Sequence, residues 1–151
     1  LAYLHAKQLL LVLDNFEELL EAAGLLAQLL DAAPQLKLLV TSREPLHLYA
    51  EWVLALHGLD KPHARELFVQ RAQRTVADFA PNDADAQIIL QVCEYVRGSP
   101  LAIELAAGWA SALPLRVLAE QIQTDLDVLA TPARDMPERQ RSVRAIFEQT
   151  F

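Results

Sequence analysis

The residue in this sequence best placed to do chemistry is an aspartate that directly follows a short apolar run. Residues 9–13 read LLLVL, Asp14 comes next, and Glu17 follows three positions later. A run this short and apolar, with a β-branched valine in it, predicts a strand buried on both faces of a parallel sheet. The aspartate then lies at the carboxyl end of the strand, the edge where open α/β sheets bind ligands. A carboxylate there can hold Mg²⁺, which prefers one or two carboxylates together with phosphate oxygens and water.

A second polar cluster follows a second apolar run. Residues 36–40 read LKLLV, and Thr41, Ser42 and Arg43 come directly after them. Between the two runs, apolar residues recur at steps of three and four over residues 16–31, which predicts a helix. Strand, helix and strand at this spacing predict a parallel βαβ unit, in which both strands end at the same edge of the sheet. We therefore expect the three polar residues to share a site with the aspartate.

Each of these side chains has a role that phosphate chemistry can use. Arg43 suits a terminal phosphate, to which a guanidinium donates charge-assisted hydrogen bonds. The hydroxyls of Thr41 and Ser42 are candidate donors to the same phosphate or to water. Glu17 is a candidate catalytic residue that polarises an attacking water. The alternatives are structural roles: Asp14 as a helix cap, the glutamate as a first-turn carboxylate that favours the helix dipole, and the arginine as a surface ion-pair partner.

The architecture is predicted to change near Gly58. A third short strand is predicted at 52–56, and only helices follow it. Four helices are expected, each marked by a capping residue or a proline. They begin at Pro62, at the N-cap Asn82, at Pro100, and at Leu115 directly after Pro114. Gly98 fits as a C-terminal cap. The predicted division is an α/β part over 1–57, a helical part over 58–130, and a linker with the start of a third element over 131–151.

Composition narrows the classes of function. The chain has a formal net charge of −7 at pH 7 and one cysteine, Cys93. The acidic balance disfavours nonspecific nucleic-acid binding, because neutralising phosphates takes an excess of lysine and arginine. A single cysteine excludes an internal disulfide and predicts a cytoplasmic location, and the absence of a long apolar run predicts no membrane span. The histidines show no ligand spacing, so we expect no zinc site. Cys93, Trp52 and Trp109 are expected to serve packing, with adenine stacking as the alternative role for either tryptophan.

Three blocks of the sequence resemble one protein family in order and spacing. LLLVLDNFEELL, LKLLVTSREPL and GSPLAIELAAG are similar to blocks of the STAND class of P-loop ATPases, above all the NB-ARC-like module of bacterial LuxR-type and related transcriptional regulators. The resemblance implies that the first block is the Walker B strand, with Asp14 as the Mg²⁺ residue. It implies that Arg43 is a sensor of the γ-phosphate and that Pro100 lies near the adenine in a helical lid. Residues 138–151 resemble the entry into a winged-helix domain.

The resemblance implies a fold, a function and partners. The fold is a partial parallel P-loop NTPase sheet followed by an all-α lid and the start of a winged helix. The function is an ATP- and ADP-dependent signalling switch that requires Mg²⁺. The partners are the nucleotide, other domains of the same chain, a second copy in the ATP-bound state, and DNA only through domains outside these residues, with no role for a membrane.

The sequence departs from the family at three points. Ser99 replaces the usual leucine, Glu18 stands where many relatives have a histidine, and no G-x-x-x-x-G-K-[ST] loop is present. We expect that loop, which cradles the phosphates, to lie upstream of Leu1. The chain is then expected to be a fragment that neither hydrolyses ATP nor binds it tightly by itself, because most of the charge stabilisation for a triphosphate is missing. Whether the full-length protein is an ATPase enzyme stays open.

Two other interpretations remain. The first is a helical protein-interaction scaffold with a degenerate nucleotide site, which would lack the upstream phosphate loop. The second is a phosphoacceptor domain of the receiver type, which also carries an aspartate at one strand end and a threonine or serine at the next. That domain needs an acidic pair on an earlier strand and a later strand that bears a lysine. The helical sequence after residue 58 argues against it.

Overall fold

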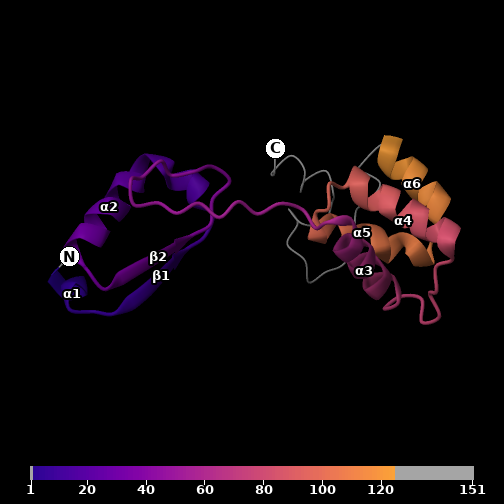
Figure 1. Cartoon of the computed structure of the whole chain (residues 1–151), viewed down its shortest axis with the longest axis horizontal. Helices are drawn as coiled ribbons and strands as arrows, with labels where there is room; N and C mark the ends of the chain where they lie inside the picture. Colours follow the sequence, from indigo (N-terminus) through magenta and orange to yellow (C-terminus); the bar gives the residue numbers. More distant parts are fainter. Residues whose placement is uncertain (1, 125–151) are drawn as a thin grey trace. The chain divides into compact units, whose positions relative to one another are not determined.

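The computed structural model describes residues 2–124 and divides the chain into two units, which meet in the sequence at residues 55 and 56 (Figure 1). The first unit is α/β and the second is helical. The predicted linker at 131–137 and the predicted helix near residue 138 lie outside the described residues. Among residues 2–124, every helix is too short or too polar to cross a lipid bilayer.

The α/β unit contains a two-stranded parallel sheet, as the sequence predicts. Its elements are α1 (Ala2–His5), β1 (Leu9–Leu13), the 3₁₀ helix η1 (Phe16–Ala22), α2 (Ala23–Ala32) and β2 (Leu36–Val40). Leu9 lies opposite Leu36, and the pairing continues in register along both strands. The backbone N–H of Thr41 donates to the carbonyl of Leu13 at 2.9 Å, which carries the ladder to the carboxyl end of both strands. The two polar clusters therefore share an edge.

The segment between the strands begins as a 3₁₀ helix, whereas the sequence predicts one regular helix over 16–31. Phe16 is buried, and its N–H donates to the carbonyl of Thr41 at 2.9 Å. Asn15, just before it, has a left-handed backbone, and Leu19 breaks the helical geometry with φ −125° and ψ 20°. The first turn is thus hydrogen-bonded to a strand end 25 positions away in sequence. The spacing of apolar residues along the segment cannot predict such a contact.

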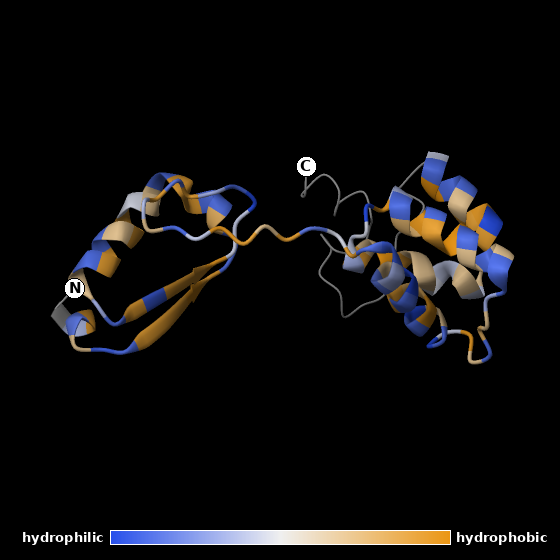
Figure 2. Ribbon diagram, in the orientation of Figure 1, coloured by the Kyte–Doolittle hydropathy of each residue, from blue (hydrophilic) through white to orange (hydrophobic). Residues whose placement is uncertain are grey.

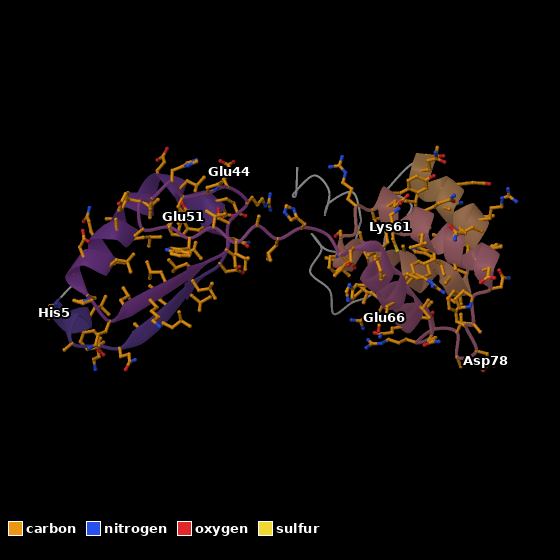
Figure 3. All side chains as sticks on the ribbon, viewed as in Figure 1. His5, Glu44, Glu51, Lys61, Glu66 and Asp78 are labelled. Carbon is orange, nitrogen blue, oxygen red and sulfur yellow. The ribbon has the colours of Figure 1, made fainter. Side chains whose placement is uncertain are left out.

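The prediction that both strands are buried on both faces is wrong for the described residues. One face packs on a core that is centred on Phe16, Ala23 and Leu26. The other face carries the exposed side chains of Leu10, Val12 and Leu39 together with Lys37, which gives β2 a hydrophilic band in Figure 2. The described helical residues that pack on this sheet lie on the first face. At the far end of the unit, the Nδ1 of His5 donates to the carbonyl of Ala32 at 2.8 Å, which ties α1 to the end of α2 (Figure 3).

The predicted third strand at 52–56 is also wrong. These residues are outside any helix or strand, and Trp52 and Leu54 are 98% and 83% exposed. The packing role expected for Trp52 is therefore not seen. A strand needs a neighbour to accept its backbone hydrogen bonds, and this segment pairs with neither described strand.

The helical unit follows the capping signals closely. Its elements are α3 (Lys61–Ala72), α4 (Asp83–Tyr95), α5 (Pro100–Gly108), the 3₁₀ helix η2 (Trp109–Ser111) and α6 (Leu115–Thr124). Asn82 and Asp85 form a capping box, in which each side chain accepts from the other residue's backbone N–H. Asp60 caps α3 by accepting from the N–H of His63 at 3.2 Å. Prolines occupy the first turns of α3 and α5, as expected.

A closed apolar core holds the helical unit together. Helix α3 packs against α4 and α5, and α4 packs against α6. Its largest fully buried side chains are Phe68, Ile89, Val92, Val96, Ile103, Leu118 and Ile122. Cys93 is buried and Trp109 packs against the same core, so their predicted packing roles are confirmed.

Two glycines, Gly58 and Gly98, lie where the backbone just before α3 contacts the backbone just after α4. Gly98 has φ +69°, its N–H donates to the carbonyl of Cys93 at 2.9 Å, and its carbonyl accepts from the N–H of Leu59 at 2.8 Å. A Cβ on Gly98 would lie 2.4 Å from the carbonyl oxygen of Leu59, and one on Gly58 would lie 2.0 Å from that of Arg97. The backbones approach so closely that glycine is required at both positions. The cap residue of α4 is Val96 and Arg97 follows it with φ 50°, so Gly98 ends the helix two residues beyond the cap and is not itself the cap that the sequence predicts.

Candidate functional site

The strand ends of the α/β unit bring Asp14 and Thr41 into direct contact. The Thr41 hydroxyl donates a short hydrogen bond to Oδ1 of Asp14 and accepts one from the N–H of Asn15 at 3.1 Å. The left-handed backbone of Asn15, with φ 57° and ψ 46°, turns its amide toward the threonine. The hydroxyl thus fixes one carboxylate oxygen, while Asp14 as a whole stays exposed.

Glu17 and Arg43 form an ion pair at the same edge. The Nε of Arg43 lies 3.2 Å from Oε1 of Glu17, and the two side chains are 50% and 18% exposed. The sequence places both residues at this edge but does not predict that they pair with each other. The arginine is therefore partly neutralised by a carboxylate of its own chain, while half of its side chain still faces solvent.

The loop after Arg43 is held by a glutamate that sequence reasoning missed. The carboxylate of Glu51 accepts from the backbone N–H of Leu46 at 2.9 Å and from that of Leu48 at 3.3 Å (Figure 3). Ser42 closes a local turn, because its hydroxyl oxygen accepts from the N–H of Glu44 at 3.3 Å. No sequence signal distinguishes Glu51 from other loop carboxylates, since its partners are backbone groups that the fold alone brings near.

The cluster formed by Asp14, Glu17, Thr41 and Arg43, called the edge cluster below, has one more negative than positive charge at neutral pH. Among the described residues, no group of three or more histidine, cysteine or acidic side chains is arranged to hold a metal ion. Asp14 could still serve Mg²⁺ as a single ligand, since that ion retains water and takes phosphate oxygens as further ligands. The donor set fits Mg²⁺ only together with a ligand that brings its own oxygens.

Pro100 belongs to the other unit, where it occupies the first turn of α5. The contacts described for the α/β unit join Asp14 with Thr41 and Glu17 with Arg43, and Ser42 lies beside them in sequence.

The helical unit has a separate small hollow of about 240 Å³ between the start of α3 and the end of α4. Lys61 and Glu94 line it and form an ion pair at 2.6 Å. Cys93 also lines it, but burial raises the pKa of its thiol to about 11. A thiol that stays protonated is a poor nucleophile and a poor metal ligand. Cys93 is a packing residue here.

Comparison with known proteins points to bacterial regulators. The chain is 34% identical over 144 residues to a protein of Mycobacterium tuberculosis that is named, provisionally, as an HTH-type transcriptional regulator. The alignment covers 94% of this chain and 16% of that protein. A protein of Mycobacterium bovis with the same provisional description aligns equally well. This chain is similar to a segment of such regulators.

A second relative is similar to this chain but has no described function. An uncharacterized protein of Mycobacterium tuberculosis is 42% identical over 115 residues, which cover 74% of this chain and 29% of that protein. No family model and no solved structure matches the chain. The chain spans 16% of the length of the regulators that it matches.

Proposed function

We propose that this chain is the distal part of a nucleotide-dependent switch of the STAND class within a bacterial transcriptional regulator. The observation that carries the proposal is the edge cluster: at the ends of two parallel strands Thr41 bonds to Asp14, and Arg43 pairs with Glu17 of η1, at the edge where α/β sheets bind ligands. The similarity to proteins described as HTH-type regulators supports the regulatory setting. In this proposal the input is ATP or ADP with Mg²⁺, and the output is a change in how neighbouring domains contact each other.

Asp14 is proposed to hold Mg²⁺, directly or through water. Its Oδ1 accepts from Thr41, which orients the carboxylate and leaves Oδ2 for the ion. Bound Mg²⁺ would supply positive charge that bridges the carboxylate and the nucleotide phosphates. The edge cluster needs such an ion, because its net negative charge repels a bare polyphosphate.

Arg43 is proposed to read the terminal phosphate by leaving Glu17. An exposed ion pair contributes about 0–1 kcal/mol, whereas a phosphate can accept two charge-assisted hydrogen bonds from one guanidinium. A γ-phosphate at this edge therefore competes successfully for the arginine, and Glu17 becomes free to polarise a water. ATP and ADP would differ in which partner holds Arg43, a local change of the kind that drives nucleotide switches.

The chain by itself is expected to bind ATP weakly and to leave it intact. Its sequence has no glycine-rich loop that ends in Gly-Lys-Ser or Gly-Lys-Thr, so no backbone cradle holds the β- and γ-phosphates. Isothermal titration of the chain with Mg-ATP should detect no micromolar binding. Micromolar affinity would contradict this part of the proposal.

The decisive test replaces Asp14 in the regulator that carries this segment. Asp14→Ala should weaken Mg²⁺-dependent retention of ATP by about 10-fold or more, the scale on which a lost charged contact acts. Asp31→Ala is the matched control, because Asp31 is an exposed acidic residue of α2 outside the edge cluster. A variant that retains and hydrolyses ATP at the parental rate would show that Asp14 is not the Mg²⁺ residue.

A scaffold without a working nucleotide site is the alternative. It is favoured by the pairing of Arg43 with Glu17, since that pair satisfies the arginine without any ligand. It predicts that the regulator lacks a phosphate loop and retains no nucleotide on purification. The receiver-type alternative has no support, because the described residues after Val40 contain no further strand that could carry the required lysine.

A further inference from the structure

The loop that follows Arg43 is closed on a single carboxylate. Residues 44–51 lie outside any helix or strand. The two oxygens of Glu51 bind different backbone groups of this loop: Oε1 accepts from the N–H of Leu46 at 2.9 Å, and Oε2 accepts from that of Leu48 at 3.3 Å. The N–H of Glu51 in turn donates to the carbonyl of Leu48 at 3.0 Å. Both the side chain and the backbone of Glu51 therefore hold the loop.

These hydrogen bonds are expected to matter more than most loop contacts. Glu51, Leu46 and Leu48 are all half-buried. A hydrogen bond to an ionised acceptor is roughly twice as strong as a neutral one. Because the loop lies outside any helix or strand, a half-buried N–H in it depends on a side chain or on water for its acceptor. Removing the carboxylate therefore weakens the whole turn.

The backbone between the two leucines is in an unfavourable conformation. His47 has φ +55°, in the left-handed region that residues other than glycine seldom enter. Leu46 and Leu48, on either side of it, pack on the core around Phe16, while His47 itself stays exposed. A strained backbone persists only where its surroundings fix it, and such residues cluster at functional sites. Here the surroundings are the two packed leucines and the carboxylate that bonds to their amides.

Arg43 lies between two fixed points of the backbone. Before it, Thr41 is bonded through its N–H to β1 and through its carbonyl to the start of η1, both at 2.9 Å. After it, Leu46 is bonded to Glu51. Only residues 42–45 span the interval, and one of them is a proline, whose ring fixes φ. The backbone of Arg43 therefore has little freedom, and the position of its guanidinium depends on both fixed points.

We propose that Glu51 is a positioning residue of the edge cluster: through its bonds to Leu46 and Leu48, it holds the loop in the shape that keeps Arg43 beside Glu17. Glu51 acts through Arg43 and is not itself assigned to the phosphate or the metal ion. The inference rests on the proposed function only for its consequence in the regulator, where a displaced Arg43 would distinguish ATP from ADP less well.

The first measurement needs no nucleotide. In the isotope-labelled 151-residue chain, the NMR signal of the Arg43 Nε–H reports the pairing with Glu17, and Arg43→Lys identifies this signal by removing it. Glu17→Gln gives the signal of the arginine without its ion pair. Glu51→Ala should move the Arg43 signal toward that position. It should also speed hydrogen exchange of the Leu46 and Leu48 amides by about 10-fold or more, the factor that corresponds to one lost hydrogen bond to a charged group.

Two further variants make the comparison specific. Glu51→Gln keeps one acceptor oxygen, so its effects should be smaller and in the same direction. Glu44→Gln is the matched control and should change neither measurement, because Glu44 is an exposed carboxylate of the same loop that joins the hydrogen bonds described for it only through its backbone N–H (Figure 3). Retained protection of the Thr41 amide shows that the sheet is intact, and Glu51→Gln decides if Glu51→Ala loses that protection.

Faster exchange at Leu46 and Leu48 with an unmoved Arg43 signal would overturn the proposal, because Glu51 would then support the loop alone. Unchanged exchange of both amides would also overturn it. In the complete regulator, Glu51→Ala should lower the ratio of ATP affinity to ADP affinity in the same direction as Arg43→Ala, by a smaller factor.

The regulator separates the two proposals. If Arg43→Ala lowers that ratio and Glu51→Ala does not, the positioning role is overturned. If neither variant changes the ratio while the Arg43 signal moves in the 151-residue chain, the positioning role stands and the proposed function fails.

Discussion

Gly98 offers the sharpest test of how the helical unit is built. The change is Gly98→Ala, which adds one methyl group at the junction of α4, α5 and the start of α3. Gly98 has φ +69°, and an added Cβ would lie 2.4 Å from the carbonyl oxygen and 2.8 Å from the amide nitrogen of Leu59. The matched control is Gly108→Ala in the same unit, where φ is −59° and nothing lies within 4 Å of the added Cβ.

The two substitutions should have opposite effects on stability. At Gly98, the left-handed backbone costs an alanine about 1–2 kcal/mol. Relief of the close contact pulls Leu59 away and breaks its hydrogen bond to the Gly98 carbonyl, which adds about 1–3 kcal/mol. The expected loss is therefore about 2–5 kcal/mol, a large share of the roughly 3–10 kcal/mol available to a domain of about 70 residues. At Gly108, alanine should stabilise by about 0.5–1 kcal/mol through its helix propensity.

Urea unfolding followed by the fluorescence of Trp109 measures both effects. Trp52→Phe in the background removes the signal of the exposed tryptophan in the other unit. With a slope of about 1 kcal/mol per M of urea, Gly98→Ala should lower the midpoint by about 2 M or more, and Gly108→Ala should raise it by about 0.5–1 M. Midpoints that agree within about 0.3 M would refute the claim that the close backbone approach requires glycine at position 98.

Three further outcomes follow from single contacts. The thiol of Cys93, whose pKa is raised to about 11 from 9.0 by burial, should react slowly with a disulfide reagent at pH 8. Because the thiol ionises at a lower pH in the unfolded chain, the stability of the fold should fall between pH 9 and 11, and Cys93→Ala should abolish that slope. The pKa of Asp60 is lowered by its hydrogen bonds from His63, so the carboxylate contributes to the stability of the fold above pH 3.8 and this contribution is lost on further acidification. Asp60→Asn should therefore make stability depend less on pH below pH 4, and an unchanged dependence would contradict this. Thr41→Val should speed hydrogen exchange of the Asn15 amide about fivefold, which corresponds to the loss of a hydrogen bond of about 1 kcal/mol. The exchange rate of the Phe16 amide should stay unchanged, because that amide bonds to the Thr41 backbone carbonyl.

The sequence alone predicted the elements whose signals are local. Capping residues and prolines marked where the helices of the second unit begin, and these signals are confirmed because a cap acts on backbone groups within three residues. The packing role predicted for Cys93 is likewise confirmed, because Cys93 belongs to the buried core of the helical unit. The parallel pairing of the strands also followed from the chain, because the intervening helix allows only that direction over so few residues.

Only the tertiary structure decided which side chains meet at the strand ends and which surfaces are covered. The bond from Thr41 to Asp14 and the pairing of Arg43 with Glu17 each join residues about 26 positions apart, and no sequence pattern distinguishes pairing with each other from pairing with a ligand. The pattern in β1 indicated burial on both faces, whereas burial depends on whether a second layer is present. Residues 52–56 form no strand for a related reason. A strand needs a neighbouring strand to accept its backbone hydrogen bonds, and an apolar sequence shows only that packing against such a neighbour would be favourable.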